Sequence, residues 1–344
     1  MKDDSPLTGV FFSLLRSGLY SRPLSPEEFS PLETLDTRTW VEIVKLARQQ
    51  SVAGLIYFAI TLLPDSIRIP GDIVLVLMAG AEEIRHGNQH KALVTDQLMS
   101  RFKARGLEPL VMKGLTVARY YPEPELRHSG DIDLYLPKQK IPEAVNCLTA
   151  PHPASDGSFH SKEDGVDIDL HDRYFDLHCR SSVLPEPGTP EATVLMLSAH
   201  ILKHAIGPGI GIRQLCDLAA AWQSLKPKLD TAAIREIFHR TGTYRWNRLL
   251  FSFMEENLGL TGSPFEGNRV CTDSLKTIIL EGGNFGHHAE ARKQALHAGD
   301  HRRKLNTLSR FLSRIPFSIR YSPRETFATV WTLISGNLLR DNRI

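Results

Sequence analysis

The stretch "LVMKGLTVARYYPEPELRHSGDIDLYLP", residues 110–137, places two aspartates one residue apart inside an apolar, strand-like run. Its last part alternates polar and apolar residues, which predicts a β-strand. Because alternate side chains of a strand share a face, Asp131 and Asp133 point to one side, whereas Ile132 and Leu134 point to the core. Two such carboxylates stand about 6.5 Å apart and repel each other by about 2–3 kcal/mol at an effective dielectric constant of about 20. A divalent cation between them reverses this repulsion, so the strand predicts a cation site.

A second strand-like segment, "VDIDLH" at residues 166–171, repeats the pattern. Its apolar residues alternate with Asp167, Asp169 and His171, which share the polar face. His171 is predicted either to hydrogen-bond a carboxylate or to serve the structure alone. Magnesium prefers oxygen ligands and borrows some from phosphates and water. If a sheet brings the two segments together, they predict a phosphoryl-transfer site for Mg²⁺, with Mn²⁺ as the alternative.

A turn at Gly114 lies before the first strand-like run, and a loop separates the two. Gly114 follows the short apolar segment "EPLVMK" and opens the helical segment "LTVARYY". A glycine in this position lets phosphate oxygens approach backbone N–H groups at the start of a helix. Lys113 adds a positive charge and Thr116 a hydroxyl, and Arg127 on the following loop can fork onto phosphate oxygens. These four residues are therefore the predicted nucleotide-binding set.

The quoted motifs, with "LMLSAHILKHA" and "IRQLCDLA" further along the chain, resemble the uncharacterised nucleotidyltransferase family of the polymerase-β-like superfamily. The resemblance extends over nearly the whole chain. It implies transfer of a nucleoside monophosphate from an NTP to an unknown acceptor, which is a small molecule, a protein or an RNA. It also implies that Gly114 is the turn glycine and that Asp131 and Asp133 are metal ligands. Asp169 is then the third carboxylate, which binds metal or activates the acceptor hydroxyl, and the resemblance favours it over Asp167.

Two other functions stay open at this point. The wider superfamily has Gly or Ser after the turn glycine, where this chain has Leu115, and Lys113 or Thr116 would have to replace that contact. One alternative is a catalytically inactive nucleotide-binding or scaffolding module. The other is a toxin-like nucleotidyltransferase that modifies tRNA. From Arg292 to Ile344 the chain has eleven Lys or Arg against three Asp or Glu, which predicts contact with RNA, an acidic partner or anionic lipid.

The expected fold class is α+β, with a small mixed β-sheet of nucleotidyltransferase type embedded in helical N- and C-terminal regions. We predict a helical region at residues 1–105, a catalytic core at residues 106–180 and a second helical region at residues 181–344. Residues 72–106 predict one long helix, which the Gly87–Asn88 pair would weaken or bend. With 344 residues, 42% of them hydrophobic, the chain can bury a substantial core, and its net charge of +2 indicates no general affinity for nucleic acid or membranes.

Several classes of protein are disfavoured by the sequence. The four cysteines lack a CxxC pair, which argues against a disulfide framework and a zinc ribbon: Cys147, Cys179, Cys216 and Cys271. We expect no signal peptide, no transmembrane segment and a cytoplasmic location. An EF-hand starting at Asp131 would need glycine and glutamate where the chain has Leu136 and Pro142. His200 and His204 have the spacing of a zinc-protease helix but lack its glutamate, so we expect a structural role.

Overall fold

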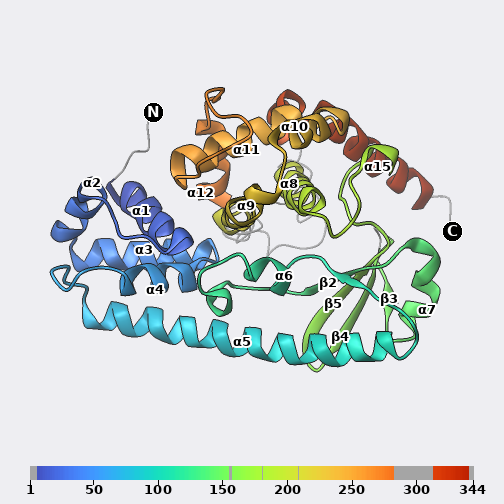
Figure 1. The fold of residues 1–344 in the computed structure, drawn as a ribbon, viewed down its shortest axis with the longest axis horizontal. Coiled ribbons are helices and arrows are strands. Elements are labelled where there is room, and N and C mark those ends of the chain that lie inside the picture. Colours follow the sequence, from blue (N-terminus) through green and yellow to red (C-terminus); the bar gives the residue numbers. More distant parts are fainter. Residues whose placement is uncertain (1–5, 155–156, 180, 208, 283–312, 341–344) are drawn as a thin grey trace. The chain divides into compact units, whose positions relative to one another are not determined.

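The computed structural model describes residues 6–154, 157–179, 181–207, 209–282 and 313–340 (Figure 1). It contains many helices and, within these residues, one five-stranded mixed sheet, which confirms the predicted α+β class. The chain divides into two compact units, Met1–Tyr174 and Phe175–Ile344. The N-terminal helices and the sheet thus belong to the same unit, and the finer division into three regions stays a prediction.

The first unit begins with helices and ends with the sheet. Its helices are α1 (Pro6–Tyr20), α2 (Pro26–Phe29), α3 (Thr37–Gln49), α4 (Ala53–Thr61), α5 (Gly71–Lys103), α6 (Leu115–Ala118) and α7 (Ile141–Val145), with 3-10 turns η1 (Ser30–Thr34), η2 (Pro124–Leu126) and η3 (Lys138–Lys140). Its strands are β1 (Leu110–Val111), β2 (Ile132–Tyr135), β3 (His152–Pro153), β4 (Phe159–Glu163) and β5 (Val166–His171). The sequence pattern did not predict strands β3 and β4.

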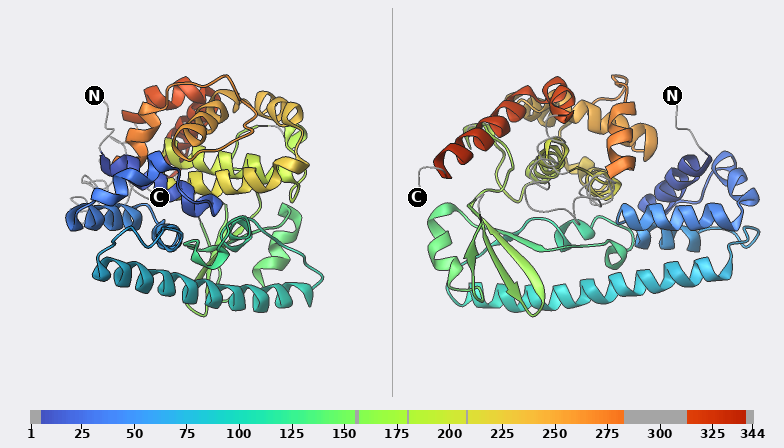
Figure 2. Two further views of the ribbon diagram at one scale, coloured as in Figure 1. Left: turned by 60° about the vertical axis from the view of Figure 1, so that its left-hand side comes forward. Right: turned by 180° about the vertical axis from the view of Figure 1, so that it is seen from behind.

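The strand order in the sheet is β1-β2-β5-β4-β3. β2 and β5 pair in parallel, whereas the other neighbouring pairs are antiparallel. One face of the sheet packs on α5, the long helix that runs beneath it in Figures 1 and 2. Leu98 and Phe102 of α5 share a core cluster with Ile132, Leu134 and Ile168 of the two parallel strands. Since strand side chains alternate, the residues between these apolar ones project from the opposite face.

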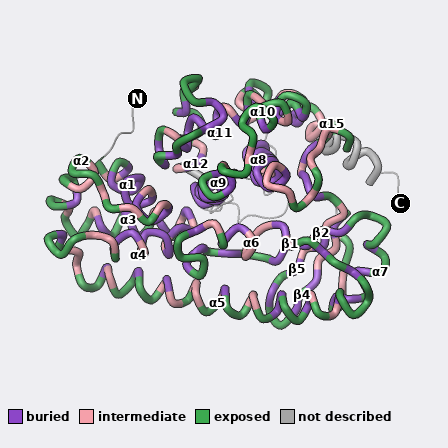
Figure 3. Tube along the Cα trace, in the orientation of Figure 1, coloured by how far each residue is buried: buried purple, intermediate pink, exposed green. Residues whose placement is uncertain are grey.

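Helix α5 is unbroken through the Gly87–Asn88 pair. Asn88 is buried, and its side chain hydrogen-bonds a neighbouring loop instead of competing for the backbone of its own helix. Along α5, buried residues alternate with exposed ones, as Figure 3 shows. This pattern is typical of a helix that covers a core on one side only.

The described residues of the second unit form mainly helices. They include α8 (Pro190–Ile206), α9 (Ile212–Leu225), α10 (Thr231–Arg240), α11 (Tyr244–Asn257), α12 (Asp273–Gly282) and α15 (Pro323–Arg340), with 3-10 turns η4 (Ser181–Val183) and η5 (Lys226–Lys228). Trp246 of α11 donates a hydrogen bond to the Ser198 carbonyl of α8 at 3.0 Å. His200 and His204 contact each other ring to ring, with centroids 4.4 Å apart, and Nδ1 of His200 lies 3.4 Å from a carboxylate oxygen of Asp176.

Part of the predicted basic region Arg292–Ile344, at residues 292–312 and 341–344, lies outside the described residues. In its described part, Phe327 and Trp331 of α15 expose 63% and 71% of their surface, so these two aromatic side chains do not belong to the core. Among the described helices, we find none that combines the length and the hydropathy needed to cross a bilayer.

Candidate active site

Asp133 and Asp169 lie side by side on the two parallel strands. In the register of β2 and β5, Asp133 is the direct partner of Asp169, and Ile132 is the partner of Ile168. Both isoleucines are buried in the core on the α5 side of the sheet. The two carboxylates therefore leave the sheet on its other face, where the alternation in the sequence predicted them. Their role as metal ligands stays a prediction.

His171 completes a group of three possible metal ligands within the described residues. Asp133, Asp169 and His171 each offer one ligand atom, and these atoms all lie within 4.8 Å of one another. Nε2 of His171 lies 2.9 Å from Oδ1 of Asp133, which fits the predicted hydrogen bond between imidazole and carboxylate. Carboxylates suit Mg²⁺ and Mn²⁺, and an imidazole suits transition metals. The donor set thus accommodates a divalent cation.

Asp131 lies immediately before β2 and completes the predicted set of carboxylates. Although the residue keeps an exposed surface, the protein around it raises the pKa of its carboxyl group, chiefly through desolvation and then through the charges of Asp133 and Asp169. The Lys113 ammonium acts in the opposite direction. The net rise in pKa means that the ionised form of Asp131 is disfavoured in the metal-free protein, first by desolvation and then by repulsion from the other two carboxylates. This is the electrostatic condition that a bound cation relieves.

Replacing Asp131 with asparagine should therefore raise the melting temperature of the metal-free protein at neutral pH. A carboxyl group whose pKa is raised by folding destabilises the folded state once it is ionised, at pH values above its usual range. Asp131→Asn removes that charge, so the gain should disappear below about pH 4, where the unfolded carboxyl is protonated. Thermal melts in EDTA at neutral and acidic pH measure the effect, and a lower melting temperature at neutral pH would contradict it.

Asp167→Asn is the matched control for this experiment. Asp167 lies on β5, two residues before Asp169, and its carboxylate forms an exposed ion pair with Lys162 at 3.2 Å. Exposed ion pairs contribute about 0–1 kcal/mol. The melting temperature of Asp167→Asn should accordingly stay close to that of the wild type at both pH values.

Lys113 and Gly114 lie beside the aspartates of this site. The Lys113 ammonium lies 3.2 Å from Oδ1 of Asp133. Gly114 has φ +57° and ψ −117°, a backbone conformation that other residues rarely adopt. A Cβ added to Gly114 would lie 3.3 Å from the carbonyl oxygen of Asp131. The glycine turn and the start of β2 are therefore in close backbone contact, as a site shared by phosphate and metal requires.

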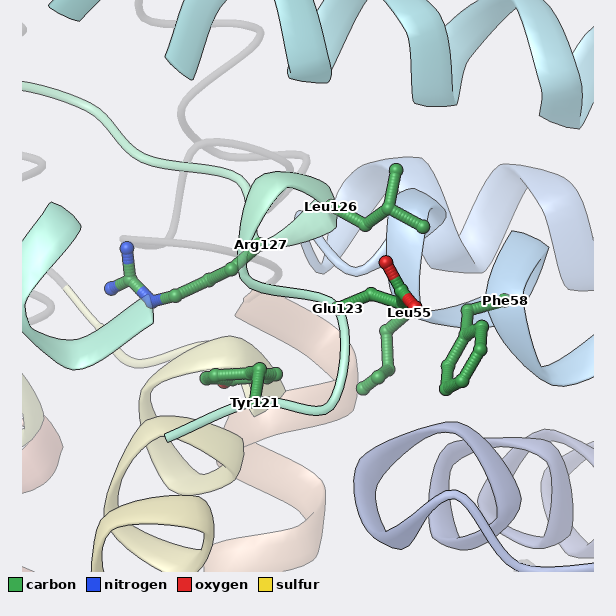
Figure 4. A pocket seen from close by; sticks show the side chains of 6 residues that line it. All are labelled: Leu55, Phe58, Tyr121, Glu123, Leu126 and Arg127. Atoms are coloured by element: carbon green, nitrogen blue, oxygen red, sulfur yellow. The ribbon is translucent and has the colours of Figure 1, made fainter. Parts of the chain in front are cut away.

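The structure shows which groups surround Thr116 and Arg127, the other two residues of the predicted nucleotide-binding set. Oγ1 of Thr116 donates a hydrogen bond to the Val111 carbonyl of β1 at 2.9 Å, so the hydroxyl proton holds the short helix α6 against the strand. Arg127 is buried, so it is not an ordinary surface arginine. It lines a small pocket in the first unit (Figure 4), and its side chain extends away from Phe58 in that view. The other lining residues are Leu55, Phe58, Tyr121, Glu123 and Leu126.

Three polar residues at this site were missed from the sequence. His160 of β4 is the register partner of Asp169, and its Nδ1 contacts the Asp169 carboxylate. Asn88 and Lys91 of α5 contact the loop that leads into Asp131. Burial lowers the pKa of the Lys91 ammonium, while the charge of Asp131 raises it and that of Arg127 lowers it. The segment "FHSKE" has a single apolar residue and no regular apolar alternation, so no local signal in the sequence marks His160.

A family model supports the resemblance that these motifs suggested. The model described as "Uncharacterised nucleotidyltransferase" matches residues 36–259, which is more than half of the chain. The chain belongs to the uncharacterised nucleotidyltransferase family. The family match includes the whole sheet as well as helices α3, α4 and α5, so these N-terminal helices are part of the family domain. Comparisons with curated proteins and with solved structures found no match.

Proposed function

We propose that the protein transfers a nucleoside monophosphate from an NTP to an acceptor hydroxyl or phosphate, with Mg²⁺ held by Asp131, Asp133 and Asp169. The observation that carries this proposal is the in-register pairing of Asp133 and Asp169 on parallel strands. The raised pKa of Asp131 supports it, because desolvation and then the charges of Asp133 and Asp169 disfavour the ionised carboxyl, and a bound cation would offset both effects. Family membership supports the general reaction class.

In the proposed reaction, an acceptor oxygen attacks the α-phosphorus of the NTP. The bond from that phosphorus to the bridging oxygen breaks, and pyrophosphate leaves with the electron pair. Mg²⁺ supplies positive charge that stabilises the phosphate oxygens in the transition state. When the acceptor is a hydroxyl, Asp169 would accept its proton, and the contact with His160 would orient this carboxylate.

The cationic side chains neutralise the charge of the triphosphate in this proposal. Lys113, held at the site by its ion pair with Asp133, and Arg127, on the loop before Asp131, carry that role. A guanidinium can contact two phosphate oxygens at once, whereas an ammonium acts as a point charge. Gly114 allows the chain to turn beside the carboxylates without a side chain in the way.

A labelling experiment tests the proposal directly. The purified protein is incubated with Mg²⁺ and each of the four NTPs, labelled at the α-phosphate, together with small-molecule, protein and RNA pools from the native host. We expect label to appear in one pool, with pyrophosphate released and with complete loss of labelling in EDTA. NTP binding without pyrophosphate release in any pool would favour the inactive nucleotide-binding module instead, and label confined to tRNA would identify the toxin-like alternative.

A further inference from the structure

The loop at residues 123–130 carries Arg127 and leads directly into Asp131, and a buried side chain of α5 holds its backbone. Nδ2 of Asn88 donates hydrogen bonds to the Glu125 carbonyl at 2.7 Å and to the Arg127 carbonyl at 2.8 Å. Oδ1 of Asn88 accepts a hydrogen bond from the hydroxyl of Ser129. One carboxamide thus contacts three residues of the 123–130 loop, and it is almost completely buried where it does so.

Lys91, one helical turn after Asn88, contacts the last part of the same loop. Its ammonium donates a hydrogen bond to the Ser129 carbonyl at 3.1 Å. The charges of Asp131 and Arg127 both act on this ammonium, one favouring and one opposing its protonated form. Lys91 is therefore located close to the two charged residues that flank Ser129 in the site.

Helix α4 supports the loop from a second direction. A Cβ added to Gly54 of α4 would lie only 2.1 Å from the carbonyl oxygen of Leu126, so the loop backbone rests directly on the helix backbone there. Residues other than glycine would push the loop away, because real Cβ atoms do not approach an oxygen so closely. At the loop's exposed side, Arg85 of α5 forms an ion pair with Glu125 at 3.2 Å.

We infer that α4 and α5 form a positioning platform for the active site, in which Asn88 fixes the 123–130 loop so that Arg127 and Asp131 meet the nucleotide and its metal. This inference rests on the proposed function. It assigns a positioning role to the N-terminal helices α4 and α5, which the family match includes. Asn88 and Gly54 are positioning residues, because they act through the loop and not on the substrate.

The chemistry of Asn88 fits this role. A buried carboxamide offers a donor group and an acceptor oxygen, and the loop uses both. Aspartate would keep an acceptor but lose the donor for the Arg127 and Glu125 carbonyls, and alanine would lose all three contacts. An asparagine in the middle of a long helix lowers the intrinsic stability of that helix, and these tertiary contacts account for its presence.

The first test compares Asn88→Ala with the wild type by amide hydrogen exchange. We expect exchange in residues 123–130 to rise about tenfold or more, because each 1.4 kcal/mol of lost stabilisation is a factor of ten. Exchange in β4 and β5 should stay unchanged. Gly80→Ala is the matched control, since a Cβ at Gly80 of the same helix meets no neighbouring atom. A uniform rise over the whole first unit, or no rise at all, would overturn the inference.

The second test is Gly54→Ala, which keeps every polar group of the platform. The added methyl group should displace Leu126 and raise exchange in the same loop residues. Gly54→Ala therefore also tests the platform if Asn88→Ala does not fold. An unchanged loop in Gly54→Ala would contradict the close contact on which the platform depends.

Binding measurements then separate this inference from the proposed function. Calorimetry with Mg²⁺ and each of ATP, GTP, CTP and UTP should give about tenfold weaker affinity for Asn88→Ala, and the difference should become smaller in an Arg127→Ala background, where only the contribution through Asp131 is left. Mn²⁺ affinity, measured by electron paramagnetic resonance, should fall as well, because Asp131 moves with the loop. If the wild type binds an NTP and Asn88→Ala binds it with the same affinity, this inference is refuted but the proposed function is not. If the wild type binds none of the four NTPs, the proposed function fails, and the Mn²⁺ affinities and exchange rates still decide whether the platform positions Asp131.

Discussion

Asparagine in place of Asp133 or Asp169 should lower the rate of nucleotidyl transfer by about a thousandfold or more. Asparagine keeps the size of the side chain but removes the negative charge, so the site loses a cation ligand at the point where transition-state charge is stabilised. Losing one preorganised electrostatic contact in an active site costs about 10²–10³-fold, and a misplaced metal adds to this loss. Pyrophosphate release and transfer of α-phosphate label both measure the effect, and circular dichroism checks the fold.

The control for these two variants is Asp167 of β5, the strand that also carries Asp169. Asp167→Asn removes an identical charge two residues from Asp169, but Asp167 is exposed and paired with Lys162. Its transfer rate should stay within about twofold of the wild type, because exposed surface substitutions change stability by only about 0.5 kcal/mol. A rate above about a tenth of the wild type in Asp133→Asn would contradict the proposed metal site. Equal losses in Asp167→Asn and Asp169→Asn would show that net charge, and not position, controls the rate.

Gly114→Ala should impair stability and activity together. Its φ of +57° and ψ of −117° impose backbone strain on any residue with a side chain, at a cost of about 1–3 kcal/mol. The new methyl group would also lie 3.3 Å from the Asp131 carbonyl, which is close enough to shift the start of β2. We therefore expect a lower denaturant midpoint and a transfer rate reduced about 100-fold, since a misplacement of 1 Å can cost that much.

Gly106→Ala separates the two effects of the Gly114 variant. Gly106 has a similar positive φ, +67°, but a Cβ there would meet no neighbouring atom. This variant should show a stability loss of the same kind and retain the wild-type transfer rate at temperatures where it is folded. If Gly114→Ala also retained that rate, the contact between the glycine turn and Asp131 would have no part in catalysis.

The parts of the site that depend on local pattern were predictable from the sequence. Alternation along "DIDLYL" and "VDIDLH" was sufficient to assign Asp133 and Asp169 to the polar faces of their strands, because side-chain direction in a strand is fixed by the backbone, whereas Asp131 lies just before β2. The structure adds the register, in which Asp133 faces Asp169. The register depends on how the chain between the strands folds, and no local pattern encodes it.

The contacts made by Asn88, Lys91 and His160 were not predictable for the same reason. Asn88 and Lys91 lie on a helix that precedes the active-site strands, and their partners in the 123–130 loop are distant in sequence. The low helix propensity of asparagine predicted that Asn88 would weaken the long helix. In the structure Asn88 is buried, and its three tertiary contacts connect α5 to the 123–130 loop. His160 lies on β4, whose polar sequence lacks the apolar alternation of a recognisable strand.

The parallel pairing of β2 with β5 has a consequence for the order in which the protein matures. Two parallel strands need a crossover connection between them. Here the connection contains α7, β3 and β4, so these segments are synthesised before β5 can pair with β2. During translation, a nascent chain that has not yet reached Val166 contains the segments of α5, β1 and β2 but not β5, which carries Asp169. Such long-range pairing forms slowly compared with helices. The carboxylates proposed to hold the metal can therefore come together only after β5 has been synthesised and has paired with β2.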